Sequence, residues 1–159
     1  MARGQLKLKR KKIAPDRKYQ SVDLSKFINK TMLSGKKSKV NNLVYKSLED
    51  AAKKLKKEPL EVFESALKEA APLIEVRSKR IGGAAYQIPV PVNPERGKHL
   101  AMKWIIDAAR ARKGASYDKK LTAEMVDLIS GAGGAFKKKE DTHKMAEANK
   151  ALAYLAKMR

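Results

Sequence analysis

The side chains of this sequence that could do chemistry are mostly basic. Lys and Arg together number 37 against 17 Asp and Glu, which gives the 159-residue chain a formal net charge of +20. Ammonium and guanidinium groups in such excess favour a polyanionic partner, either nucleic acid or an anionic membrane surface. We therefore expect these side chains to neutralise phosphates rather than to carry out covalent chemistry.

The bases are gathered in clusters. Residues 1–12 contain six bases and no acid, Lys36 and Lys37 follow Gly35, and further bases lie in residues 77–80, 110–120 and 137–139. Each cluster falls at a tail, a predicted loop or a predicted helix end, where backbone and side chains can reach phosphates. This distribution favours nucleic-acid binding over an evenly charged soluble surface.

Catalytic and metal-binding groups are poorly represented. There is no Cys, and His99 and His143 lie far apart, so we expect neither a metal site nor a Cys nucleophile. Glu140 and Asp141 are adjacent, and on a helix such neighbours point about 100° apart instead of converging on one substrate. The glycine-rich residues 131–134 lack the spacing of a phosphate-binding loop and are interpreted as a flexible connector. The sequence thus predicts no enzyme, no metal and no cofactor.

Apolar residues at helical spacing predict about six helices that position the bases. The apolar stripes run over residues 24–32, 40–55, 63–70, 100–109, 121–129 and 145–155. Asp23 is the expected N-cap of the first helix, and Gly35 is expected to stop it. Residues 114–120 are expected to form a basic loop. Trp104 lies on the apolar face of its helix, which favours a core position over a base-stacking one.

The final helix is expected to open at residues 137–139 and to turn Met145, Ala148, Leu152 and Leu155 inward. Lysines at a helix N-terminus oppose the macrodipole, so three of them there would cost stability. A binding role for these lysines would explain why they occupy such a position.

Between the third and fourth helices the pattern becomes alternating. Residues 73–80 and 84–92 are rich in Val, Ile and Tyr, and Gly82 and Gly83 permit the positive φ angles of a tight hairpin turn. A two-stranded ribbon is marginal alone in water. Because Arg77, Lys79 and Arg80 surround its tip, we predict an arm that projects toward a partner; a hairpin packed flat on the body is the alternative.

The predicted fold is therefore mainly α: a bundle of about six helices with one protruding β-hairpin arm, at residues 72–92, between the third and fourth helices. Residues 13–159 are expected to form a single helical RNA-binding domain. Residues 1–12 form a basic N-terminal extension, interpreted as an arm that orders along phosphates or as a solubilising tail. The chain has no apolar run near the ~18 residues of a membrane span and no signal-peptide core, so a cytoplasmic location is expected.

Two nucleic-acid functions fit this fold. Architectural proteins that bend DNA also combine a helical body with β-arms, but their arms carry apolar wedges that unstack bases. Here the turn is Gly82-Gly83, and Ile81 is the large apolar residue beside it. Dispersed basic clusters instead favour an irregular folded RNA contacted from several sides. RNA is the favoured partner, and DNA bending is the alternative.

Six segments of the chain resemble the family of the seventh protein of the small ribosomal subunit, in its bacterial form. They are PDRKY (15–19), KFIN (26–29), GKKS (35–38), PLEVFESAL (59–67), EVRSKRIGGAAYQIPVPV (75–92) and KKKEDTHKMAEANKA (137–151), and they span nearly the whole chain. The chain departs from many relatives at Tyr117, where they carry Met, and after Tyr154, where they carry Trp and some continue into a longer tail.

The resemblance implies a primary ribosomal-RNA-binding protein that binds the 3′ major domain of the small-subunit RNA and nucleates assembly of the head. It implies a place near the exit-site transfer RNA, with messenger RNA nearby and the ninth and eleventh small-subunit proteins as neighbours. It implies no membrane contact and no obligate homo-oligomer.

The resemblance also implies which residues make these contacts. The ribosomal-RNA contacts are Arg3, Lys7, Lys9, Arg10, Lys11, Lys12, Lys36, Lys37, Arg77, Lys79, Arg80, Arg96, Arg110, Arg112, Lys113, Lys119, Lys120, Lys137, Lys138 and Lys139. The residues near transfer RNA are Arg80, Gly82, Gly83, Tyr86, His143 and Lys150.

Overall fold

The structure, a computed structural model, describes residues 13–156. In chain order the elements of this part are α1 (Val22–Thr31), α2 (Lys37–Leu55), α3 (Pro59–Ala70), β1 (Ile74–Ile81), β2 (Ala84–Pro91), α4 (Pro94–Ala111), α5 (Tyr117–Ile129), α6 (Gly133–Ala148) and the 3₁₀-helix η1 (Lys150–Ala156). The prediction of a mainly α fold with one hairpin between the third and fourth helices is confirmed. The predicted basic extension, residues 1–12, lies outside the described residues.

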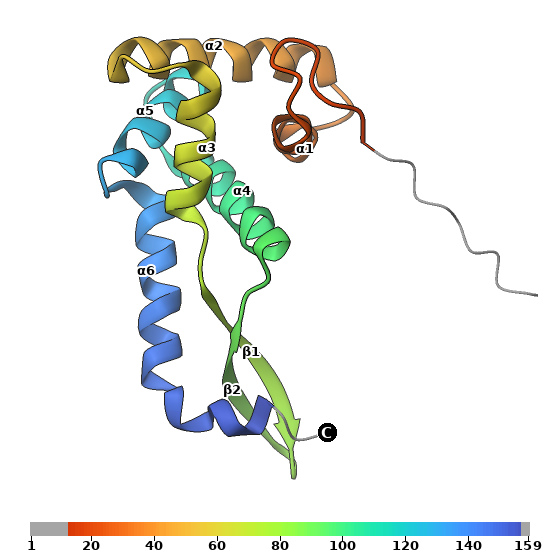
Figure 1. The fold of residues 1–159 in the computed structure, drawn as a ribbon, viewed down its shortest axis with the longest axis vertical. Helices are drawn as coiled ribbons and strands as arrows, with labels where there is room; N and C mark the ends of the chain where they lie inside the picture. Colours follow the sequence, from red (N-terminus) through yellow and green to blue (C-terminus); the bar gives the residue numbers. More distant parts are fainter. Residues whose placement is uncertain (1–12, 157–159) are drawn as a thin grey trace, which may run out of the picture.

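The molecule is elongated and has two parts (Figure 1). Helices α1–α5 form one part, which we call the body, with α2 lying across its end. The hairpin and α6 run side by side away from the body, and η1 turns from the end of α6 to the hairpin. We call the hairpin, α6 and η1 together the arm. The hairpin therefore projects as predicted, but it is flanked by helix and does not stand alone.

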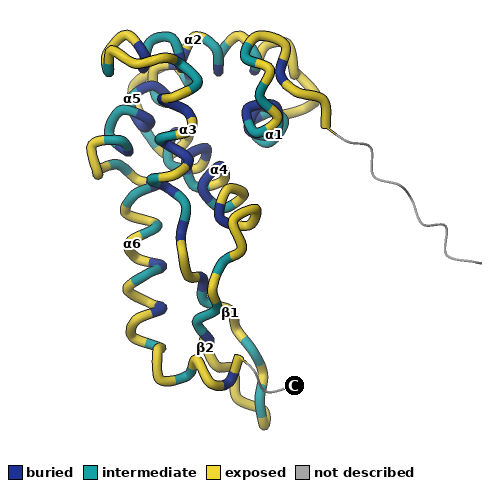
Figure 2. Tube along the Cα trace, viewed as in Figure 1, coloured by how far each residue is buried: buried dark blue, intermediate teal, exposed yellow. Residues whose placement is uncertain are grey.

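The core lies within the body (Figure 2). Phe27 of α1 and Phe63 of α3 are fully buried and meet edge to face, with ring centroids 5.4 Å apart. Leu48 of α2, Ile105 of α4 and Met125 of α5 are buried in the same cluster. Trp104 packs against this cluster but is only partly buried, so it lies at the edge of the core. Each helix of the body contributes the apolar stripe that its sequence predicts.

The cap of α1 differs from the prediction. The Ser21 hydroxyl, not the Asp23 carboxylate, accepts the hydrogen bond from the Leu24 amide, at 3.3 Å. Asp23 lies one residue inside the helix, so its carboxylate is free to pair with other helices. The helix ends at Thr31, earlier than the predicted stop at Gly35, which instead adopts a φ of 70° in the turn before α2.

The prediction for the last helix is wrong at both ends. Helix α6 begins at Gly133, so residues 137–139 lie in its second turn, and the glycine-rich residues 131–134 are not simply a flexible connector. A Cβ on Gly134 would lie 3.0 Å from the Cβ of Ala108, so glycine here lets α4 and α6 approach closely. Met145 and Ala148 are exposed rather than inward, because the buried face of the helix follows Ala135, Thr142 and Ala146. Leu155 of η1 is buried as predicted.

The hairpin has the turn that its sequence predicts. Ile74 pairs with Pro91 at one end and Ile81 with Ala84 at the other. Gly82 and Gly83 close the turn with φ angles of 55° and 89°, which a side chain would disfavour. Arg77 pairs with Ile88 in the middle of the ribbon, so of the three bases expected at the tip it lies farthest from the turn.

Among the described residues, none of the helices is both long enough and apolar enough to cross a membrane.

Candidate nucleic-acid interface

A connected series of basic side chains runs over the body from the start of α2 to the base of the hairpin. Lys36, Lys39 and Arg110 line one cavity, and Arg110 also lines a second with Lys30 and Lys103. His99 lies beside Lys30, and both feel the charges of Arg96 and Lys103. We call this set the basic belt; its members are Lys30, Lys36, Lys39, Arg77, Arg96, His99, Lys103 and Arg110.

The belt begins at the N-terminus of α2. Lys36 is the N-cap residue and its side chain makes no capping hydrogen bond, and the first turn contains no acidic residue. The amide groups of the first turn and the helix dipole therefore present positive potential without a local carboxylate to offset it. Lys36, Lys37 and Lys39 are exposed around this helix end. Such an arrangement favours a phosphate.

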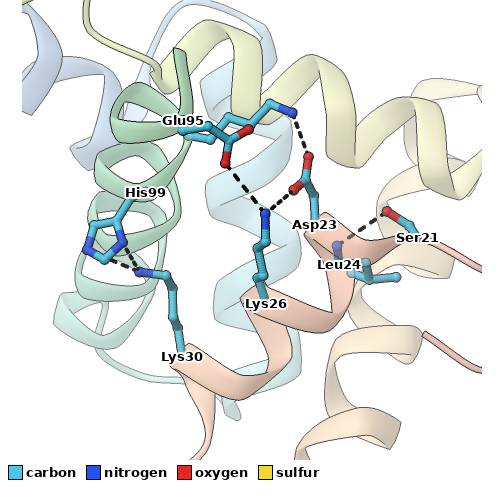
Figure 3. Close-up of polar contacts among 8 residues, drawn as sticks. Ser21, Asp23, Leu24, Lys26, Lys30, Glu95 and His99 are labelled. Atoms are coloured by element: carbon cyan, nitrogen blue, oxygen red, sulfur yellow. Dashed lines mark hydrogen bonds and ion pairs between the residues drawn. The ribbon is translucent and has the colours of Figure 1, made fainter. Parts of the chain in front are cut away.

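Three contacts join α1 to α4 beside the middle of the belt (Figure 3). Lys98 Nζ lies 2.7 Å from the Asp23 carboxylate, and Lys26 Nζ lies 3.6 Å from that of Glu95. The third contact differs, because Lys30 Nζ lies 2.8 Å from His99 Nδ1. Two of the three contacts therefore balance opposite charges, whereas the third joins a cation to a group that could become one.

The cluster around Lys30 and His99 has an excess of positive charge, although Arg96 is paired with Glu75 and Asp107 lines the same cavity as Lys30 and Lys103. Partial burial lowers the pKa of Lys30, and the nearby charges of Arg96 and Lys103 lower it further. Burial, Lys30 and the same two cations lower the pKa of His99. His99 is thus held neutral, with a ring nitrogen free to accept from Lys30. An anion placed here would relieve the repulsion, so the arrangement suits a phosphate oxygen.

The belt ends at the junction of hairpin and α4. The Glu75 carboxylate is 9% exposed and accepts hydrogen bonds from Arg77, at 2.6 Å, and from Arg96, at 3.2 Å. Burial alone would raise the pKa of Glu75, but the hydrogen bonds and charges of the two guanidinium groups lower it overall. One carboxylate therefore orients two guanidinium groups, whose remaining N–H groups can bind phosphate.

Comparisons with known proteins identify the family of the chain that carries this belt. A family model described as "Ribosomal protein S7p/S5e" matches residues 3–150. The chain belongs to the ribosomal protein S7p/S5e family. It is 52% identical to the small ribosomal subunit protein uS7 of Carboxydothermus hydrogenoformans, over 89% of this chain and 91% of that protein. It is 50% identical to the protein of the same name in Chloroflexus aggregans, over 95% and 96% of the two chains.

The resemblance found in the sequence is therefore confirmed. The S7p/S5e family consists of ribosomal proteins and not of enzymes, which confirms the prediction that the chain is not an enzyme. Membership gives the chain a structural role in the small ribosomal subunit, as its sequence predicted.

Several residues predicted to contact RNA in this S7p/S5e member lie outside the basic belt. Arg112 donates to Glu124 Oε2 at 2.8 Å and to Asp127 Oδ2 at 2.5 Å. The other oxygen of Glu124 accepts from the Ala135 amide, at 2.9 Å. Arg112 therefore holds the end of α4 against α5 and the start of α6, and two carboxylates already balance its charge. The geometry gives it a structural role.

The predicted basic loop at 114–120 is shorter than expected. Helix α5 begins at Tyr117, so Lys119 and Lys120 lie in its first turn and Lys113 lies just before it. The Asp118 carboxylate in that turn is 3% exposed and pairs with Lys46 of α2, at 2.8 Å. The hydrogen bonds from Lys46 and Ser116 lower the pKa of Asp118 to about 2. An acid in this turn offsets part of the positive potential there.

The lysines of α6 are on another side of the molecule. Figure 1 places α6 on the side opposite α1, so residues 137–139 do not join the belt. Lys137 and Lys138 are exposed. Lys139 donates to the Glu69 backbone carbonyl at 2.6 Å and lies over the Phe136 ring, 5.6 Å from its centroid. Of these three, Lys137 and Lys138 are the ones presented to solvent.

The residues predicted to lie near transfer RNA are all in the arm but form two groups. Arg80, Gly82, Gly83 and Tyr86 are exposed in the outer half of the hairpin. His143 instead lies at the base, where its Nε2 accepts from the Leu73 amide at 3.1 Å. Lys150, at the start of η1, lies 3.7 Å from Glu147. His143 and Lys150 line one groove against Ile74 and Pro89.

Four members of the belt were not predicted from the sequence: Lys30, Lys39, His99 and Lys103. Lys30, His99 and Lys103 lie on the polar sides of predicted helices, where a base is ordinarily just solvated. Helices α1 and α4 are separated by some 60 residues of chain, so no local pattern shows that their polar sides meet. The only local signal was the excess of positive charge on both helices.

Proposed function

We propose that the protein binds small-subunit ribosomal RNA directly, with the basic belt neutralising phosphates of a folded RNA. The observation that carries this proposal is the cluster of Lys30, His99, Arg96 and Lys103, where the positive groups lower the pKa of Lys30 and of His99, although Arg96 is paired with Glu75. Such repulsion is tolerated in the free protein and relieved by a bound phosphate. The resemblance adds the 3′ major domain as the RNA and the nucleation of head assembly as the consequence.

The arm is proposed to approach the exit-site transfer RNA with its outer hairpin. Support comes from the exposure of Arg80 and Tyr86 and from the projection of the hairpin beyond the body (Figure 1). Messenger RNA nearby and the ninth and eleventh small-subunit proteins as neighbours are proposed on the resemblance alone. Family membership disfavours the DNA-bending alternative, and the glycine turn offers no apolar wedge for it.

The test is a salt titration of binding to a transcript of the 3′ major domain. With about 6–10 phosphate contacts, affinity should fall by roughly 10³–10⁵ between 50 and 200 mM salt. A duplex DNA of the same length should bind more weakly and without a preferred site. A flat salt dependence, or tighter binding to the duplex, would contradict the proposal.

A pair of double variants locates the binding surface. Lys30→Gln with Lys103→Gln removes two belt cations, and Lys53→Gln with Lys54→Gln removes two exposed lysines near the other end of α2. Both pairs lower the net charge equally. The belt pair should lower the salt slope by about 2, since each phosphate contact contributes about 1. Equal effects from the two pairs would show that net charge, and not the belt, drives binding.

A further inference from the structure

An apolar cavity opens where the α1–α2 loop meets α2, α4 and α5. Its volume is about 350 Å³, at the lower end of the ~300–1,000 Å³ typical of small-molecule sites. Its apolar lining comes from Leu33 in the loop, Val40 and Leu43 of α2, and Tyr117 of α5. Leu33 is 63% exposed, which is unusual for a large apolar side chain of a small protein. The cavity therefore offers apolar surface to solvent.

Tyr117 gives the cavity an aromatic lining. Its hydroxyl is buried and has no hydrogen-bond partner of good geometry among the described residues, although Thr31 lies close enough to influence it. Burial raises the pKa of this hydroxyl, which is therefore neutral. Because the hydroxyl is closed off from solvent, the ring is the part of the side chain that lines the cavity. A flat apolar ligand could pack against it.

Three cations complete the lining of this apolar surface. Lys36 and Lys39 are exposed at the N-terminus of α2, and Arg110 lies at the end of α4. The Arg110 guanidinium donates to the Thr31 carbonyl at 3.1 Å, which holds it beside the cavity. No Asp or Glu lines the cavity among the described residues. These surroundings therefore favour an apolar occupant that also carries negative charge.

A nucleotide has both properties, because its base presents an apolar π-face and its phosphates carry the charge. Arg110 also lines the second cavity, with Lys30, Lys103 and Asp107, so the apolar cavity lies next to the basic belt. We propose that this cavity receives one unstacked base of the bound RNA, with the adjoining phosphates on Lys36, Lys39 and Arg110. This inference rests on the proposed function only for the identity of the RNA.

The first test uses the free, full-length protein and small probes. Uridine and adenosine 5′-monophosphate are titrated while methyl NMR signals of Leu33, Val40 and Leu43 are followed. Ribose 5-phosphate and inorganic phosphate serve as controls, since they carry the charge without the base. We expect the nucleotides to shift these methyl signals and the controls to leave them nearly unchanged. Equal shifts with inorganic phosphate would reduce the site to a simple anion site and overturn the proposal.

The second test fills the cavity. Leu43→Trp places a bulky side chain in it, and Leu55→Trp, at an equally half-buried position of the same helix, is the matched control. Base stacking contributes about 1–3 kcal/mol per base, so Leu43→Trp should weaken binding of the RNA transcript by about 5- to 150-fold. Its salt slope should stay at the wild-type value, because no cation is removed.

Leu33→Ser is a second variant that preserves folding, since Leu33 is mostly exposed, and we expect it to weaken binding in the same direction but less. Wild-type affinity in both Leu43→Trp and Leu33→Ser would overturn the base pocket. A wild-type protein without salt-dependent RNA binding would instead overturn the proposed function, so the two failures are distinguishable. Loss of binding to an acidic peptide, with RNA binding unchanged, would assign the cavity to a protein partner and also overturn the proposal.

Discussion

The body and the arm of this protein are stabilised in different ways. In the body, five helices converge on one apolar cluster, in which Phe27 and Phe63 are fully buried. In the hairpin of the arm, Glu75 and Ile88 are the buried residues of the two strands. Burial of apolar area is the main source of folding free energy. The comparison indicates that the body determines folding, while the arm is a mostly exposed surface positioned by a few contacts.

The body and the arm also differ in what their buried carboxylates connect. In the body, buried carboxylates such as Asp118 and Glu124 join helices to one another through Lys46 and Arg112. In the arm, the buried carboxylate Glu75 joins the hairpin to α4 of the body. Ionic contacts thus connect elements in the body and attach the arm to it.

The largest effect is expected from removing a core ring. Phe63→Ala should lower the free energy of unfolding by about 3–5 kcal/mol, because it deletes buried apolar volume and its contact with Phe27. Ile88→Ala, the matched change in the arm, should cost only about 2 kcal/mol, since its exposed neighbours can close the space. Urea denaturation followed by circular dichroism measures both. Equal costs would show that arm and body form one cooperative core.

The next effect concerns Asp118 in the body. Asp118→Asn should lower the free energy of unfolding at neutral pH by about 1–3 kcal/mol, because it weakens a charged hydrogen bond from Lys46. The folded pKa of Asp118, about 2, is below its ordinary 3.8, so its contribution is present above 3.8 and lost as pH falls toward 2. Urea denaturation at several acidic pH values should show a larger loss in the wild type than in the variant, which keeps Asp23 and Glu75, whose pKa values are also lowered.

A matched control for this prediction is Glu61→Gln, which removes an exposed partner of Lys57. It should change stability by less than about 0.5 kcal/mol. If the two variants behave alike over the acidic range, the Asp118 contact is no stronger than a surface ion pair.

A smaller effect on stability is expected from shortening the arm. Replacing residues 78–85 with a short Gly-Ser turn should leave the helicity of the body intact, because few buried side chains are removed. The change deletes Lys79, which donates to the Leu155 carbonyl at 3.3 Å, so η1 should become less ordered. RNA binding should persist but weaken, and reconstituted subunits should retain less exit-site transfer RNA. A large loss of helicity would make the hairpin structural, and unchanged retention would remove its proposed transfer-RNA role.

The smallest effect is expected from His99. Its pKa in the folded protein lies below 6.5, so the free energy of unfolding should fall slightly as pH drops below that value. A bound phosphate favours the protonated ring, so RNA affinity should rise as pH falls through the same range, by less than about tenfold. Affinity measured above and below this pH in wild type and in His99→Gln checks the sign. A wild-type affinity that falls on acidification, or a variant that keeps the rise, would contradict it.

The helices of the body were predictable because each has a single stripe of large apolar residues. The boundaries of α6 were not, because its buried side chains are Ala135, Thr142 and Ala146, which are small or polar and leave no such stripe. The need for glycine at Gly134 comes from the close approach of Ala108 in α4. Patterns within one segment do not contain such information.

The residues of the candidate site likewise divide into those that the local sequence predicts and those brought together only by packing. Lys36 and Lys37 were predicted because they are adjacent in a turn, whereas Lys30 and Lys103 meet only when α1 packs on α4. The carboxylate partners of Arg112 were likewise not predictable from the local sequence, since they lie on the next helix, 12 and 15 residues along the chain. The contacts expected from residues 1–12 stay predictions.

The hairpin is connected to α6 and η1 at two separated points. His143 of α6 accepts from the Leu73 amide just before the first strand, and Lys79 donates to the Leu155 carbonyl of η1 farther out. Hairpin, α6 and η1 thus form the sides of a closed frame, which resists bending better than a free ribbon of the same length. A force on the glycine turn would therefore tilt the frame as a unit about its attachment to the body, and strain would reach the close packing of Gly134 against Ala108.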